Sequence, residues 1–159
     1  MSIEQKERTC EGCTLCCKLP KIEELNKPAY TWCKHCTPKA NLGCGIHETR
    51  PNQCREFSCL WLLGRVPEEY KPSEVKFVMT MQKEENVDKM MIVIFIEDTN
   101  ASTLRRKPFI RWIMGVMERK GFLVGAIING VKYQLFISDD KKQFLWKRVN
   151  SYQDIKDDR

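Results

Sequence analysis

The sequence predicts an α+β protein: an irregular cysteine-rich module followed by a small, mostly antiparallel sheet with one packed helix. Two observations support this prediction. All nine cysteines lie within residues 10–59, and the hundred residues that follow contain none. After the cysteines, strand-sized apolar runs accompany a single segment of helical periodicity. We divide the chain into a cysteine module at residues 1–66, a strand-strand-helix-strand-strand unit at 67–150 and a polar tail at 151–159.

Within the module, residues 10–17 are too dense in cysteine for a regular element and predict a tight loop, in which Gly12 eases the turn. A short helical turn is expected at residues 22–26, and residues 31–49 read as irregular. Pro51 and Gly64 suit the two ends of a helix, with Thr49 as its cap. On that helix Cys54 and Cys59 point apart, so either the helix breaks near Cys59 or the two thiols serve different sites.

The second half predicts strands at residues 75–81 and 90–97. A helix follows, beginning at Pro108 and ending at Gly121. Residues 122–128 and 131–137 flank Asn129-Gly130, a strong signal for a hairpin with a two-residue turn. Residues 141–150 are expected to add a last helical turn.

Composition excludes some classes of function. With 42% hydrophobic and 30% charged residues, the chain is not wholly disordered. The net charge of +6 is spread out, with nine basic and seven acidic residues in 1–62 and eighteen and fourteen in the rest. Nucleic-acid binding is therefore unsupported. The sequence shows no apolar leader segment and no apolar run of membrane-spanning length, so we expect a cytoplasmic protein without membrane contact.

In a reducing compartment, clustered cysteines indicate metal binding or redox chemistry more often than structural disulfides, and nine is an odd number for a closed disulfide set. Thiolate sulfurs select zinc, copper(I) and iron–sulfur clusters. The pairs Cys10/Cys13 and Cys33/Cys36 have the spacing of zinc ligands. The run from Cys10 to Cys16 also matches part of a ferredoxin motif, without its fourth cysteine and proline. Zinc and iron both remain open.

The adjacent pair Cys16-Cys17 indicates two sites that share one loop, because neighbouring side chains diverge and one metal rarely takes both. Eight thiols would fill two four-sulfur sites and leave one spare.

The spacing of the first four cysteines and the segment GCGIHETRPNQCREFSC together resemble the YkgJ-type cysteine-cluster family, the CxxCxxCC zinc- or iron-chelating domain. The resemblance covers residues 10–59 and implies metal chelation without a defined reaction. The residues on the family's tail pattern are Cys44, Ile46, Glu48, Arg50, Pro51, Cys54, Arg55, Phe57 and Cys59. The implied ligands are Cys10, Cys13, Cys16, Cys17, Cys33, Cys44, Cys54 and Cys59. His47 replaces a tyrosine of the family, and Cys36 has no counterpart, so Cys36 is either the spare thiol or a substitute ligand.

Other side chains have two interpretations each. Arg50 and Arg55 either donate to thiolate sulfurs around the metal or form ordinary surface ion pairs. His47 is expected to pack as an aromatic group rather than bind metal, and His35 to be an exposed loop residue. Trp61 is assigned to the core.

We therefore predict a protein that chelates zinc or iron, with an iron–sulfur cluster as one form, at two cysteine sites. The alternatives are an iron–sulfur electron-transfer or redox enzyme component and a metal carrier. The sheet-and-helix unit would either support the module or contact a protein partner. The sequence names no reaction, since phosphate-binding loops and catalytic triads are absent from it.

Overall fold

A computed structural model describes residues 8–38, 43–83, 89–138 and 143–150, so the predicted tail at 151–159 lies outside the described residues. The chain forms two compact units, Met1–Met79 and Thr80–Arg159. The fold is α+β, as predicted.

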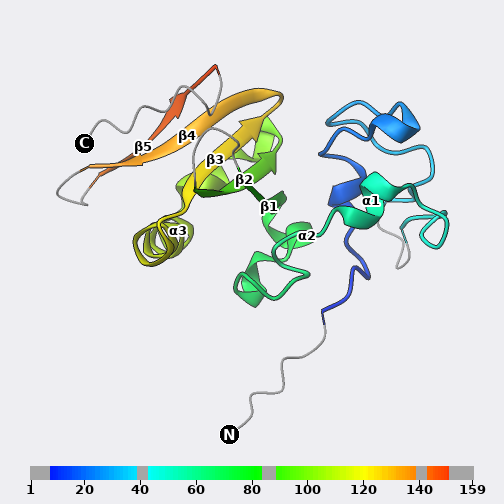
Figure 1. Cartoon of the computed structure of the whole chain (residues 1–159), viewed down its shortest axis with the longest axis horizontal. Coiled ribbons are helices and arrows are strands. Elements are labelled where there is room, and N and C mark those ends of the chain that lie inside the picture. The colour runs from blue at the N-terminus through cyan, green and yellow to red at the C-terminus, as the bar shows by residue number, and fades with distance from the viewer. Residues whose placement is uncertain (1–7, 39–42, 84–88, 139–142, 151–159) are drawn as a thin grey trace, which may run out of the picture. The chain divides into compact units, whose positions relative to one another are not determined.

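The sheet has five strands in the order β1-β2-β3-β4-β5 (Figure 1). β2 and β3 pair in parallel, with Met91 opposite Leu123, whereas β3–β4 and β4–β5 pair antiparallel. A parallel pair needs a crossover, which the 3₁₀ segment η4 (Asp98–Arg105) and helix α3 (Lys107–Lys120) provide. The strands are β1 (Phe77–Lys83), β2 (Met90–Ile96), β3 (Leu123–Ile128), β4 (Val131–Ile137) and β5 (Phe144–Arg148).

The predicted helix and hairpin are confirmed. α3 has proline in its first turn and ends where Gly121 adopts φ +65°. Its apolar stripe is buried through Phe109, Ile110 and Ile113. Between β3 and β4, Asn129 and Gly130 both have positive φ, 46° and 84°, as a tight hairpin turn requires.

The prediction of a helical turn at residues 141–150 is wrong, because Phe144–Arg148 forms strand β5. β5 pairs with β4 in the register that places Ile137 opposite Phe144. β5 pairs with the strand directly before it in the chain, and the hydrogen bonds between the two strands override the local helical preference. The first strand also begins later than expected, at Phe77, because Pro72–Val75 forms the short helix α2 and Lys76 ends it at φ +64°.

Unit Met1–Met79 consists of short elements joined by loops. The predicted helix over residues 51–64 is wrong in extent: α1 covers only Asn52–Glu56, and Phe57 is extended. The backbone N–H of Leu60 donates to Met79 O at 2.8 Å, which holds the chain after α1 in a non-helical path. Buried apolar side chains here include Leu19, Ile22, Leu60, Val66 and Val78. The other elements are η1 (Leu15–Cys17), η2 (Glu23–Leu25), η3 (Glu68–Tyr70) and α2.

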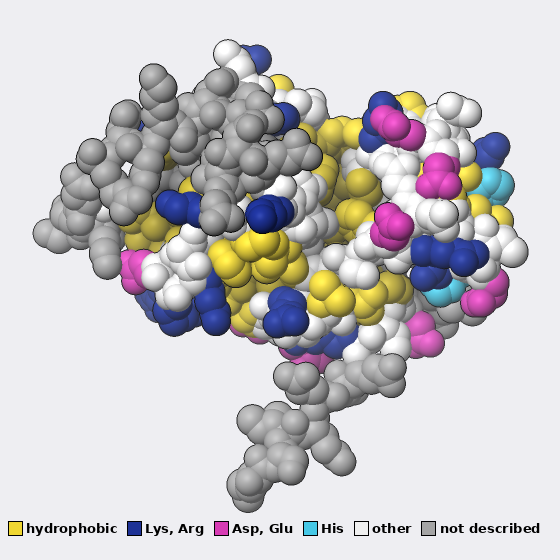
Figure 2. Space-filling model, viewed as in Figure 1, with side chains coloured by type: hydrophobic (Ala, Val, Ile, Leu, Met, Phe, Trp, Pro, Cys, Tyr) yellow, Lys and Arg dark blue, Asp and Glu magenta, His cyan; other side chains and the backbone are white. Residues whose placement is uncertain are grey.

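Surface charge does not gather in one place on the face in Figure 2, where Lys and Arg side chains form several separate groups. Among the described residues, no helix has both the length and the apolar character needed to cross a membrane.

Candidate functional site

All nine cysteines lie among the described residues of unit Met1–Met79, and none of them is in a disulfide. Four of them line one pocket and the other five gather around Cys17, and the two groups meet where the Cys16 thiol hydrogen-bonds to the Cys17 sulfur. The first thiol group lines one pocket and consists of Cys10, Cys13, Cys16 and Cys59. The second thiol group surrounds Cys17 and consists of Cys17, Cys33, Cys36, Cys44 and Cys54.

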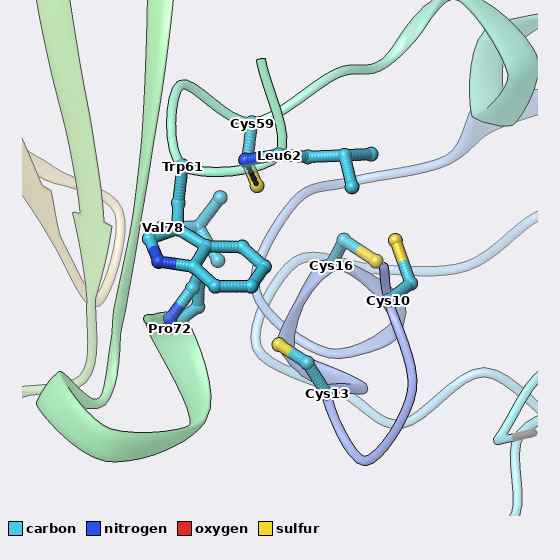
Figure 3. Close-up of a pocket in the computed structure, with 8 residues that line it drawn as sticks. All are labelled: Cys10, Cys13, Cys16, Cys59, Trp61, Leu62, Pro72 and Val78. Carbon is cyan, nitrogen blue, oxygen red and sulfur yellow. Dashed lines mark hydrogen bonds between the residues drawn. The ribbon is translucent and has the colours of Figure 1, made fainter. Parts of the chain in front are cut away.

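The first thiol group lines a cavity of about 20 Å³, enough for one water-sized body. Figure 3 shows the four thiols around the pocket together with the indole of Trp61. Burial, followed by the neighbouring thiols of Cys59 and Cys13, raises the pKa of Cys10. Burial also raises the pKa of Cys59, again with a contribution from Cys13. Cys10 is exposed at the mouth of the pocket, and Cys13, Cys16 and Cys59 are half-buried. The rest of the wall is hydrocarbon and indole, from Trp61, Leu62, Pro72 and Val78.

Local backbone geometry forms this group. The N–H of Cys13 donates to Cys10 O at 2.9 Å, which closes the first C-x-x-C turn. Gly12 has φ +70° in that turn, a conformation that L side chains rarely adopt. Across the pocket, the Cys59 sulfur accepts the N–H of Leu62 at 3.4 Å, shown dashed in Figure 3. Cys59 joins the group because α1 ends before it.

Two cations attach the Cys10 loop to the wall of the pocket. The Arg8 guanidinium lies 5.1 Å from the Trp61 ring centroid and donates to Trp61 O and Val66 O, each at 2.8 Å. The Lys71 ammonium lies 5.5 Å from the same ring and donates to Glu11 O at 3.2 Å. Both contacts span more than fifty residues to neutral carbonyls, so no sequence motif could have revealed them.

The second thiol group is organised by backbone hydrogen bonds between cysteines. The N–H of Cys33 donates to Cys17 O at 2.9 Å, and the N–H of Cys36 donates to Cys33 O at 3.0 Å. Cys36 and Cys44 face each other in an isolated antiparallel bridge. The thiols of Cys16, Cys36 and Cys44 donate to the Cys17 sulfur, which lowers the pKa of Cys17 to about 6. Burial and the Cys17 charge raise the pKa of Cys36 to about 12.

Gly43 lets the Cys44 strand approach the first cysteine loop. A β-carbon at Gly43 would lie 2.0 Å from Thr14 Cγ2 and 3.3 Å from Thr37 O. Only glycine fits this gap, because the facing atoms belong to a β-branched side chain and to backbone. Gly43 and Thr14 therefore lie in close contact beside the cysteines.

Cys54 reaches the second group through the docking of α1 on η2. Gln53 makes two hydrogen bonds to η2. Its backbone N–H donates to Glu24 Oε1 at 2.7 Å, and its side-chain Oε1 accepts the N–H of Glu23 at 2.8 Å. Burial, followed by the charges of Cys17 and Cys33, raises the pKa of Cys54.

Lys27 is a buried cation beside the second group, with only 5% of its surface exposed. Its ammonium donates to Lys18 O at 3.0 Å, Pro20 O at 2.5 Å and Pro28 O at 2.9 Å. Burial lowers the pKa of Lys27, and the nearby thiols of Cys33 and Cys17 oppose the change. Lysine is almost never buried without a partner. Nothing in the local sequence distinguishes Lys27 from a surface lysine, so its burial could not be predicted.

The other candidates lie at the edge of the cysteine groups. Arg50 donates to His47 O at 2.8 Å, and Arg55 donates to Arg50 O at 2.8 Å and Glu48 O at 3.2 Å. Burial raises the pKa of both Cys10 and Cys44, and the Arg50 charge opposes part of that rise. The His47 side chain is 53% exposed, with Nδ1 3.4 Å from Glu48 Oε1. His35 is half-buried, and its carbonyl accepts the N–H of Gly45.

Within the described ranges, no three Cys, His, Asp or Glu side chains converge in an arrangement that could hold a metal ion as it stands. The donor chemistry nevertheless suits a soft metal, since thiols gather in both groups. Metal binding would have to draw the sulfurs inward and remove their protons.

Comparisons with protein-family models, with curated proteins and with solved structures found no match to this chain. The likeness to the YkgJ-type family therefore stays a prediction from the cysteine motif.

Proposed function

We propose that the chain binds two metal ions through cysteine thiolates, one at each thiol group. The observation behind the proposal is that the adjacent thiols of Cys16 and Cys17, which hydrogen-bond to each other, each have a different set of further thiols around them. Cys16 lines the first pocket, whereas Cys17 is at the centre of the second group. The eight cysteines implied by the family resemblance then divide into two sets of four. The ligands would be Cys10, Cys13, Cys16 and Cys59 at one site, and Cys17, Cys33, Cys44 and Cys54 at the other.

Four sulfur ligands suit either zinc or iron. Zinc ions are one form of the proposal, and an iron–sulfur cluster is the alternative. A bound metal would chiefly fix the loops of unit Met1–Met79, because four-sulfur sites leave no position open for substrate.

The chain's own residues would prepare the sites for thiolates. Hydrogen bonds to the Cys17 sulfur stabilise its charged form before any metal arrives. Lys27 supplies a positive charge that offsets the thiolates of the second group. Arg8 and Lys71 hold the Cys10 loop against Trp61, so the first sulfurs start near their final places.

The test is to purify the full chain without oxygen, record its visible spectrum, and count zinc and iron per chain in the same sample. A colourless protein with about two zinc ions supports the proposal in its structural form. Absorption near ~400 nm with iron supports the cluster alternative and an electron-transfer role. Neither metal at stoichiometry contradicts the proposal.

A further inference from the structure

The second thiol group contains one sulfur more than a four-coordinate metal needs. The extra thiol is Cys36, and the backbone places it directly opposite Cys44. Thr37 N–H donates to Gly43 O at 2.7 Å, and Gly45 N–H donates to His35 O at 2.7 Å. These two hydrogen bonds flank the facing pair on both sides, so Cys36 and Cys44 occupy a non-hydrogen-bonded position of the antiparallel bridge.

That position favours a disulfide. Facing residues in a non-hydrogen-bonded antiparallel pair have Cα atoms ~4.5 Å apart and side chains on the same side. Disulfides require a Cα separation of roughly 4.4–6.8 Å. The non-hydrogen-bonded pairing thus supplies the kind of backbone arrangement that a disulfide needs. Both side chains are half-buried rather than enclosed, so a small oxidant can reach them.

We propose that Cys36 and Cys44 are a redox pair that forms a disulfide and thereby withdraws Cys44 from the second metal site. The oxidant is a low-molecular-weight disulfide. One of the two thiolates attacks a sulfur of that disulfide and releases one small thiol. The other cysteine then attacks the mixed disulfide and releases the second thiol. Two cysteine thiols are oxidised, the small disulfide is reduced to two thiols, and atoms and electrons balance.

The effect on metal rests on the proposed function. With Cys44 bonded to Cys36, the second site retains Cys17, Cys33 and Cys54, one sulfur short of a closed set. The first site shares none of these ligands. Oxidation should therefore release metal from one site and leave the other occupied.

The disulfide itself is tested without any metal. The full chain is stripped of metal under reducing conditions, treated with glutathione disulfide and digested with trypsin, and the linked peptides are identified by tandem mass spectrometry. Fragmentation must separate Cys44 from Cys54, because Pro51 blocks cleavage after Arg50 and leaves both in one peptide. A dominant Cys36–Cys44 linkage is expected. A Cys44 linked mainly to Cys17 or Cys54 overturns the proposal, whatever the metal content.

The release of metal is tested on protein loaded with zinc alone. Glutathione disulfide should release about one of two zinc ions from the wild-type chain. Cys36→Ser keeps a hydroxyl donor toward the Cys17 sulfur, so it should still bind two zinc ions but release none. Cys13→Ser should still form the Cys36–Cys44 disulfide. Release that is equal with and without Cys36 overturns the coupling. A chain that forms the disulfide but never binds zinc or iron contradicts the proposed function and leaves the redox pair standing.

Discussion

The two thiol groups use the same kind of side chain in different surroundings. The first group faces hydrocarbon and the Trp61 indole. The nearby cations Arg8 and Lys71 donate to backbone carbonyls, those of Trp61 and Glu11, rather than to the thiols. The second group surrounds a backbone bridge between cysteines and has a buried cation, Lys27, beside it. Apolar and cationic side chains from outside the group surround the first group, whereas a backbone bridge between two of its own cysteines runs through the second.

This difference has an electrostatic consequence. Four thiolates around a divalent ion leave a net negative charge, and burying such a charge is costly unless a cation is near. In the second group Lys27 meets this need directly. In the first group, Arg50 influences Cys10 from the edge. The two sites should therefore respond differently to loss of a ligand, of a cation or of a backbone contact.

The largest expected effect comes from removing one ligand at each site. Cys13→Ser should remove about half of the bound metal and lower stability by several kcal/mol, because site formation is coupled to folding. Cys54→Ser should do the same at the second site. Metal counts and melting temperature on the two variants measure this. If either variant loses both metals at once, the sites are not independent.

Replacing Lys27 should affect the second site alone. Lys27→Met leaves three carbonyls without their donor and removes the buried charge, at a cost of about 1–3 kcal/mol in stability. The affinity of the second site for zinc should fall, while the first is unchanged, as measured by competition with a chelator. Lys21→Met, at an exposed lysine, is the control. Equal zinc affinity in Lys27→Met and wild type would show that Lys27 only ties the loop together.

The close contact between Gly43 and Thr14 can be tested by introducing a clash and then relieving it. Gly43→Ala places a β-carbon against Thr14 Cγ2, and overpacking of this kind costs roughly 1–3 kcal/mol. Thr14→Ser removes the opposing methyl, so the double variant should regain part of the lost melting temperature. Gly64→Ala tests backbone strain alone, since Gly64 has φ +66° with open space around it. A double variant no better than Gly43→Ala would place the strain elsewhere, at Thr37 O.

The smallest effect concerns reactivity rather than stability. In metal-free protein, the lowered pKa of Cys17, about 6, makes it a thiolate above that pH, while Cys36, with a pKa of about 12, stays protonated. Labelling with iodoacetamide should therefore rise at Cys17 through pH 6 and remain low at Cys36 up to pH 8. Mass spectrometry of the labelled peptides measures both. Faster labelling of Cys36 than of Cys17 at pH 7 would reverse the assignment of hydrogen-bond donor and acceptor.

Local signals predicted the elements that depend on neighbours in sequence. Asn129-Gly130 predicted the hairpin because both residues tolerate positive φ, and Pro108 and Gly121 predicted the limits of α3 because each suits one end of a helix. The other predictions were wrong because hydrogen bonds to other segments of the chain override the local signals. β5 forms on the edge of β4, and the path after α1 is set by the bond from Leu60 to Met79. The sequence of residues 144–148 does not reveal the pairing with β4, and the sequence after α1 does not reveal the bond to Met79.

The same division holds for the candidate site. By itself the sequence determined which residues are thiols and that Gly12 eases a tight turn. It predicted that the Cys16 and Cys17 side chains diverge, whereas in the structure their thiols hydrogen-bond to each other. Only the tertiary structure decided which cysteines belong together, that Cys36 faces Cys44, and that Lys27 is buried beside them. Spacing governs contacts within a turn, whereas the grouping of Cys59 with Cys10, or of Cys54 with Cys17, depends on chain segments that meet only after folding.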